Sequence, residues 1–227
     1  MILTKLLNAM CVLVLCGTLV AGLTPFHRPR NAVSWLSNAN GLRFDKHGIA
    51  WSFGTFQTAS AQNDASCSLE IWLQPALARA SNTLLAFYNP QDPLQLSLHQ
   101  YRAYLILERK TMDDDHRSQV IGIDNVFSPV KSVFITISSD THDTSIYLDG
   151  SLARSFPLFR LGDACTGQLV IGTSPIENDG WTGQLKGLAL YERPLSVPEV
   201  RQHFERWTTQ GKLEAFRTGK CKGGLPL

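Results

Sequence analysis

The carboxylates of this chain are the side chains best suited to chemistry, and their spacing argues against catalysis. Hydrolysis of a glycoside needs two carboxyl groups that face each other across the scissile bond. Glu70 lies in the alternating segment 68–75, and neither it nor Glu108 has a second carboxylate at the required spacing. We expect Glu70 to face solvent or the edge of a sheet. The sequence therefore predicts that the protein is not an enzyme.

Oxygen-bearing side chains in loops are candidates for a cation site, because calcium takes several ligands from carboxylates and carbonyls. The densest acidic cluster is a run of three aspartates that is also typical of a solvated turn, Asp113, Asp114 and Asp115. Four further residues lie in loops that the predicted strand order could bring to one rim, Asp140, Asp143, Asn178 and Asp179. We name these four as candidate calcium ligands.

Other site chemistries lack the residues that they need. A zinc site requires Cys or His pairs at ligand spacing. No CxxC or HExxH motif occurs, and four histidines are scattered along the chain, His99, His116, His142 and His203. Gly-rich phosphate loops and GxSxG nucleophile motifs are also missing. The net charge is +2 without a basic stripe, so nucleic-acid binding has no electrostatic footprint and we expect no nucleic-acid partner.

Aromatic rings are candidates for a sugar-binding surface, where they would lie beside amide and hydroxyl groups. Five residues qualify, namely Trp51, Trp72, Tyr88, Tyr101 and Tyr104. The alternative for each ring is packing in the core or at the edge of a sheet, because aromatic side chains supply much of the buried area of a sandwich. The sequence leaves both alternatives open.

Short alternating segments predict the fold that would position these residues. Turn signals recur roughly every 8–12 residues, which is typical of a two-sheet sandwich. Asp149 and Gly150 separate two such segments and predict a tight hairpin, because a type I′ turn needs positive φ at both central residues. The chain is therefore predicted to be all-β, with two antiparallel sheets packed face to face.

One short amphipathic helix is predicted after the last strand. Ser196 and Glu199 form a capping box, in which each side chain satisfies an unpaired backbone donor. Val200, Phe204 and Trp207 then share one face at helical spacing. This face would lie across the end or face of the sandwich.

A long apolar run, residues 6–23, precedes the predicted sandwich and forms an N-terminal apolar helix. Lys5 before it and the sequence Val20-x-Gly22 fit a signal peptide with a small-residue cleavage site. The run is also compatible with an uncleaved membrane anchor. Both alternatives stay open, and both predict an exported protein that is secreted or anchored on the periplasmic side or cell surface.

The cysteines fit an oxidising compartment. Cys67 and Cys165 each flank a predicted strand and could form a disulfide, although small buried free cysteines are the alternative. Cys11 and Cys16 lie within the apolar run, and Cys221 lies in the C-terminal tail. The predicted organisation is a leader or anchor at 1–23, a linker at 24–39, the β domain at 40–209 and a disordered tail at 210–227.

Several segments, taken in order, resemble the LamG-like (concanavalin A-like) jelly-roll family of bacterial exported proteins. The matching pieces are SLEIWLQP at 68–75, FITISS at 134–139, SIYLDG at 145–150, LVIGTS at 169–174 and WTGQLKGLALYERPLS at 181–196. The resemblance covers roughly residues 40–207 and implies a jelly-roll sandwich. Segments such as NAVSWL also resemble proteins that place this module beside a VanZ-like membrane domain.

The resemblance implies a function in binding. Members of the family include sugar-binding lectins, calcium-binding modules and some glycoside hydrolases. Lys186 and Gly187 stand where relatives often carry acidic residues, so a family metal site is not carried over directly. We expect a non-catalytic extracytoplasmic module that recognises a glycan or another envelope component. The alternatives are a structural or protein-interaction module that partners a membrane protein and, third, a glycoside hydrolase.

Overall fold

The computed structural model of the chain falls into two units, residues 1–30 and 31–227. It describes residues 2–23, 31–37, 39–56, 66–77, 79–90, 96–110, 118–129, 131–176 and 179–220. In the first unit, α1 (Ile2–Leu23) is a helix over the predicted apolar segment. Within the described residues, no helix has both the length and the apolar character needed to cross a membrane.

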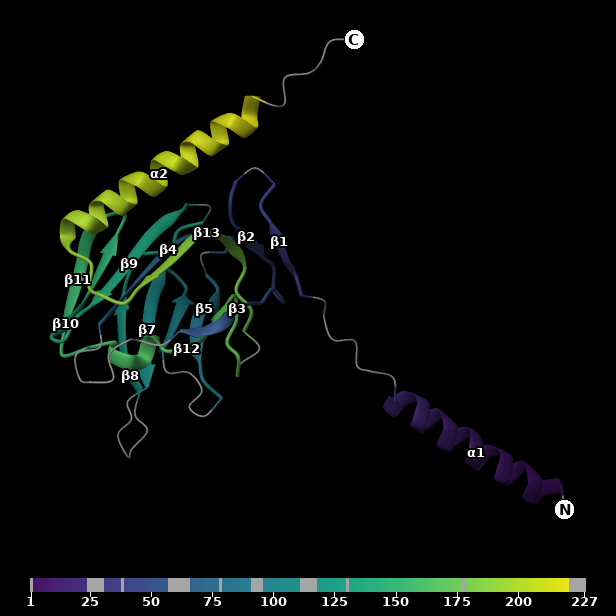
Figure 1. The fold of residues 1–227 in the computed structure, drawn as a ribbon. Helices are drawn as coiled ribbons and strands as arrows, with labels where there is room; N and C mark the ends of the chain where they lie inside the picture. Colours follow the sequence, from purple (N-terminus) through teal and green to yellow (C-terminus); the bar gives the residue numbers. More distant parts are fainter. Residues whose placement is uncertain are drawn as a thin grey trace, which may run out of the picture. The chain divides into compact units, whose positions relative to one another are not determined.

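The second unit is the predicted sandwich of two antiparallel sheets (Figure 1). One sheet has seven strands in the order β1-β2-β13-β4-β9-β10-β11, namely β1 (Val33–Trp35), β2 (Leu42–Phe44), β13 (Gly183–Tyr191), β4 (Cys67–Pro75), β9 (Val133–Ser139), β10 (Asp143–Leu148) and β11 (Ser151–Pro157). The other has six strands in the order β3-β12-β5-β6-β7-β8, namely β3 (Ala50–Phe56), β12 (Gly167–Ile171), β5 (Ser81–Tyr88), β6 (Leu96–Tyr101), β7 (Tyr104–Lys110) and β8 (Ser118–Ile123). A short 3₁₀ helix, η1 (Gly162–Cys165), precedes β12.

The core lies between the two sheets because side chains alternate along each strand. Leu69 and Ile71 of β4 and Leu96 and Leu98 of β6 are buried in one hydrophobic cluster. Trp181 is also fully buried, and its indole N–H donates to the side chain of Gln100 at 2.9 Å. The ring of Trp181 therefore packs inside the sandwich with its one polar atom satisfied.

The local signals read from the sequence are present at the β10–β11 turn and at the start of the C-terminal helix. Asp149 and Gly150 have φ of 50° and 77°, as a type I′ turn requires. The carboxylate of Glu199 accepts from the backbone N–H of Ser196 at 2.9 Å, which is one half of the predicted capping box, and the Ser196 hydroxyl donates to the same carboxylate at 2.7 Å. Hydrogen bonds from Arg193 and from Ser196 lower the pKa of Glu199 to about 2.

Two boundaries differ from the prediction. Helix α2 (Val197–Lys220) has 24 residues, whereas a short helix and a disordered tail from residue 210 were expected. Strong helix formers in its second half, such as Leu213 and Ala215, favour this continuation where the apolar periodicity fades. At the other end, β1 forms within the predicted linker, because its residues pair with β2 in register, Val33 opposite Phe44.

Candidate functional site

Glu70, at the centre of the seven-stranded sheet, is fully buried, so the prediction that it faces solvent is wrong. Its two carboxylate oxygens each lie 3.1 Å from Nδ1 of His203, and Oε2 accepts from the Tyr191 hydroxyl at 2.9 Å. Burial, together with the hydrogen bond to Glu70, raises the pKa of Tyr191 to about 12. Glu70 therefore holds α2 and β13 together, because His203 and Tyr191 lie on those two elements.

Helix α2 closes the middle of the outer face of the seven-stranded sheet (Figure 1). The Trp207 ring lies 5.4 Å from the Phe134 ring and 6.5 Å from the Trp72 ring, measured between centroids. Gly187 of β13 makes room for this ring, since a Cβ at this position would overlap the Trp207 ring. The sequence did not reveal this cover, because the helix that provides it is about 130 residues away from Glu70 along the chain.

The face of β4 that carries Glu70 has no second carboxylate. Side chains two positions apart lie on the same face of a strand, and the next two residues on this face are Trp72 and Gln74. Glu108, the other candidate, lies on β7 of the opposite sheet. The two glutamates that the sequence singled out are thus not brought together.

Asp140, one of the candidate calcium ligands, completes the β9–β10 turn. Its Oδ1 accepts from the backbone N–H of His142 at 2.7 Å and from that of Asp143 at 2.9 Å. These two hydrogen bonds, Asp143 first, lower the pKa of Asp140. The turn lies beside the start of β4, where Ser139 pairs with Cys67. Cys67 is joined by a disulfide to Cys165.

Asp179 is held at a different place, near the start of β5. Its Oδ2 accepts from the Thr83 hydroxyl at 2.6 Å and from the Thr83 N–H at 2.8 Å, and its Oδ1 accepts from the Ser174 N–H at 3.0 Å. The Thr83 oxygen also contacts Nδ1 of His99 at 3.1 Å, and Nε2 of His99 contacts the Ser97 hydroxyl at 2.7 Å. These successive contacts hold the loop before Gly180 against the six-stranded sheet.

The candidate calcium ligands are therefore not assembled into one set. Asp179 lies at the Thr83 end of β5. Asp140 lies at the other end of the sandwich. Its turn is next to Cys67 at the start of β4, and the disulfide joins Cys67 to Cys165 in η1. The strand after η1, β12, begins beside Tyr88, which is at the opposite end of β5 from Thr83. Among the described residues, no three His, Cys, Asp or Glu side chains are grouped so that they could hold a metal ion. Asn178 and the aspartates at 113–115 lie outside the described residues.

Four of the five candidate aromatic residues share the outer face of the six-stranded sheet, namely Trp51, Tyr88, Tyr101 and Tyr104. Their neighbours along the strands, such as Phe87 and Leu105, lie in the core. Trp51, Tyr101 and Tyr104 are 44%, 48% and 46% exposed, so these rings are accessible from solvent. The fifth, Trp72, lies under α2 on the other sheet.

A pocket of about 450 Å³ lies at the edge of this face, where β8 adjoins β11. Its lining combines the Tyr104 ring with aliphatic and polar groups, and consists of Tyr104, Ile106, Val120, Ile121, Gly122, Asp124 and Arg154. The volume falls within the range of small-molecule sites, ~300–1,000 Å³. Asp124 provides hydrogen-bond acceptors and Arg154 provides donors beside the apolar wall.

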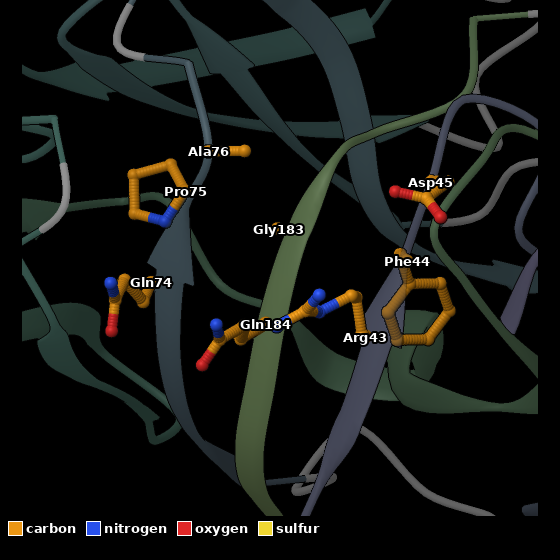
Figure 2. Close-up of a pocket in the computed structure, with 8 residues that line it drawn as sticks. All are labelled: Arg43, Phe44, Asp45, Gln74, Pro75, Ala76, Gly183 and Gln184. Carbon is orange, nitrogen blue, oxygen red and sulfur yellow. The ribbon is translucent and has the colours of Figure 1, made fainter. Parts of the chain in front are cut away.

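A second pocket, of about 210 Å³, lies where β2, β13 and β4 meet in the seven-stranded sheet (Figure 2). It is lined by Arg43, Phe44, Asp45, Gln74, Pro75, Ala76, Gly183 and Gln184. Gln184 pairs with Arg43 on one side and with Gln74 on the other, so the three polar side chains share one face. No local sequence pattern predicts this pocket, because its three strands are far apart along the chain.

Solved structures with a similar fold include binding domains of botulinum neurotoxins. The binding domain of serotype D is 12% identical with a TM-score of 0.59, and the alignment covers 77% of this chain and 44% of that one. The binding domain of neurotoxin DC, solved in complex with rat synaptotagmin II, is 14% identical with a TM-score of 0.57, covering 78% and 46%. The binding domain of serotype G is 13% identical with a TM-score of 0.53, and the alignment covers 76% of this chain and 48% of that one. This chain thus aligns with less than half of each of these structures.

Comparison at the level of sequence identifies the family. No curated protein matches this chain. The profile of one superfamily matches residues 51–201, which is more than half of the chain and includes most strands of both sheets. Together with the jelly-roll sandwich described above, this match shows that the protein belongs to the concanavalin A-like lectin/glucanases superfamily.

Proposed function

We propose that this protein is a non-catalytic binding module that recognises a glycan of the cell envelope. The observation that supports this most directly is the 450 Å³ pocket beside Tyr104. A half-exposed tyrosine ring beside aliphatic side chains offers a sugar an apolar face, while Asp124 and Arg154 offer partners for its hydroxyl groups. The similar neurotoxin structures are binding domains, which also favours a role in binding.

The pockets support a module without hydrolase activity. Asp124 is the one carboxylate in the lining of the larger pocket, and Asp45 is the one in the lining of the smaller pocket. Glycoside hydrolysis by the usual mechanisms needs a pair of carboxyl groups. Glu70 is sealed beneath α2 and engaged by His203 and Tyr191.

A glycan-binding screen of the full chain tests the proposal, run once with calcium and once with a chelator. We expect a hit in which Tyr104→Ala weakens binding about tenfold, the effect of ~1.4 kcal/mol. Phe53→Ala, an exposed aromatic residue on β3 outside the pocket, serves as the matched control and should leave binding unchanged. Loss of binding on chelation would implicate calcium, at a site other than the four predicted ligands Asp140, Asp143, Asn178 and Asp179, because Asp140 and Asp179 lie at opposite ends of the sandwich. The absence of any glycan hit under both conditions would refute the proposal.

The second candidate function is a protein-interaction module that partners a membrane protein. Edge strand β3 favours it, because Trp51 is partly exposed and Phe53 is fully exposed there. Exposed aromatic residues are common anchors in protein interfaces. Site-specific photo-crosslinking from position 53, with Leu152 on β11 as the control position, would test this function. A defined crosslinked partner at 53 but not at 152 would favour it over the glycan module.

We further propose that the module works outside the cytoplasm. The disulfide between Cys67 and Cys165 supports this, because disulfides persist mainly in oxidising compartments. The apolar segment 6–23 supports it as well, acting as a signal peptide or as an anchor. Cell fractionation with thiol alkylation tests the proposal, and finding the protein in the cytoplasm with both thiols reduced would refute it.

A further inference from the structure

The 210 Å³ pocket shown in Figure 2 presents hydrogen-bond donors and an acceptor at different positions. Arg43 lies on β2, Gln184 on β13 and Gln74 on β4, and cross-strand pairing holds the three side chains on one face. Asp45 lines the pocket on the β2 side. Phe44 contributes no exposed ring, because it is 1% exposed, so the side chains that can make directed contacts with a ligand here are the polar ones.

The orientation of the Gln74 amide is fixed by its neighbours. Its oxygen accepts from the Lys186 ammonium at 2.8 Å and from the Ser132 hydroxyl at 3.1 Å. Lys186 is held in turn by the same hydroxyl at 2.7 Å and lies 5.4 Å from the centre of the Trp72 ring. Because two donors occupy the amide oxygen, the NH₂ group of Gln74 is turned away from them and can donate to a ligand. Figure 2 shows this nitrogen on the side of Pro75 and the oxygen on the opposite side.

The charges around the pocket select the ligand. The Arg43 guanidinium is exposed to solvent, and its planar set of donors matches a carboxylate in two parallel hydrogen bonds. Lys186 adds a second positive charge behind Gln74. Asp45 accepts hydrogen bonds and repels an anion, so the anionic group of a ligand belongs at Arg43, and its hydroxyl groups belong at Asp45 and the two amides.

We propose that this pocket binds one sugar unit that carries a carboxylate, of the uronic acid type. Arg43 would hold the carboxylate, and the amides of Gln184 and Gln74 together with Asp45 would hold ring hydroxyls. The volume is below the ~300–1,000 Å³ of sites for larger ligands, which fits a single unit of a chain. The pocket lies on the other sheet from Tyr104, so this inference stands or falls independently of the Tyr104 site.

The test compares trigalacturonic acid with its methyl ester, which keeps the size and removes the charge. Binding to the ¹⁵N-labelled full chain is followed by NMR through the side-chain amide signals of Gln74 and Gln184. We expect both signals to shift with the acid, with at least tenfold weaker binding of the ester, because charge-assisted hydrogen bonds are the stronger ones. Arg43→Gln should reduce binding of the acid at least tenfold, and Arg201→Gln, an exposed arginine on α2, should not.

Two further variants separate this proposal from the others. Tyr104→Ala should leave binding of the acid unchanged, so failure of the Tyr104 site would not be confused with failure of this pocket. Lys186→Met should weaken binding of the acid. It should also shift the Gln74 amide signal of the protein without ligand, because Lys186 is a positioning residue that orients that amide. Equal binding of acid and ester, equal effects of Arg43→Gln and Arg201→Gln, or unshifted Gln74 and Gln184 signals would each overturn the proposal. Tighter binding of galactose 6-sulfate than of the acid would overturn the choice of a carboxylate.

Discussion

Replacement of His203 by alanine should destabilise the protein through the buried carboxylate of Glu70. A hydrogen bond to a charged group contributes ~1.5–3 kcal/mol, and removing one partner of a buried ion pair costs ~3–5 kcal/mol. The lower part of this combined range applies, because the His203 side chain is 17% exposed and Tyr191 still donates to Glu70. We expect His203→Ala to lower the free energy of unfolding by ~2–3 kcal/mol.

Urea unfolding of the oxidised full chain, followed by tryptophan fluorescence, measures this effect. In thermal unfolding the same change should lower Tm by ~4–12 °C, at ~2–4 °C per kcal/mol for a chain of this size. His142→Ala is the matched control, because the His142 side chain is 88% exposed and close only to Asp140 among acidic groups in the described contacts. The control should change stability by no more than ~0.5 kcal/mol.

A double-mutant cycle with Glu70→Gln isolates the pair itself. If His203 acts through the Glu70 carboxylate, its loss should cost ~1–2 kcal/mol less in the Glu70→Gln background. A His203→Ala effect below ~0.5 kcal/mol would refute the reasoning. Equal costs of His203→Ala in both backgrounds would also refute it, since the histidine would then stabilise the fold by packing alone.

Three more predictions concern stability. The pKa of Tyr191 is raised to about 12 in the folded state, against ~10 unfolded, so its contribution is fully present below pH 10 and is lost as pH rises through 12. The free energy of unfolding of Tyr191→Phe should therefore fall less between pH 9 and pH 12 than that of the unchanged protein, which urea unfolding curves at each pH measure. Gly187→Ala should cost ~1–3 kcal/mol by pushing on Trp207, whereas Gly54→Ala has open space and should not, which thermal unfolding of both variants checks. Replacing Cys67 and Cys165 by alanine should cost ~3–5 kcal/mol, because their bond spans 98 residues, and an unchanged urea midpoint would contradict this.

The sandwich could be predicted from the sequence because its signals are local. The alternation of β4, the Asp149-Gly150 turn and the capping box at Ser196 each depend on a few neighbouring residues. The position of α2 could not be predicted in this way. Its apolar face was evident, but which surface it covers depends on Gly187, a glycine whose missing side chain makes room for Trp207.

The same limit explains the errors and gaps at the candidate sites. Glu70 was expected to face solvent because an alternating strand usually exposes its polar residues. Burial of both faces of β4 follows from a helix that starts at Val197, and no pattern around Glu70 reveals it. Arg43, Gln74 and Gln184 likewise carry no joint signal, because only the strand order β2-β13-β4 makes them neighbours.

The cover that α2 provides also determines where a ligand can bind. Its contacts with Glu70, Phe134 and Trp72 close the central part of the outer face of the seven-stranded sheet. The two pockets described here lie away from these contacts, one beside Tyr104 on the opposite sheet and one at the β2 side of the same sheet. A ligand that bound under α2 would first have to break the buried Glu70 pair. The loss of stability expected for His203→Ala would therefore also indicate how firmly that central face is closed to ligands.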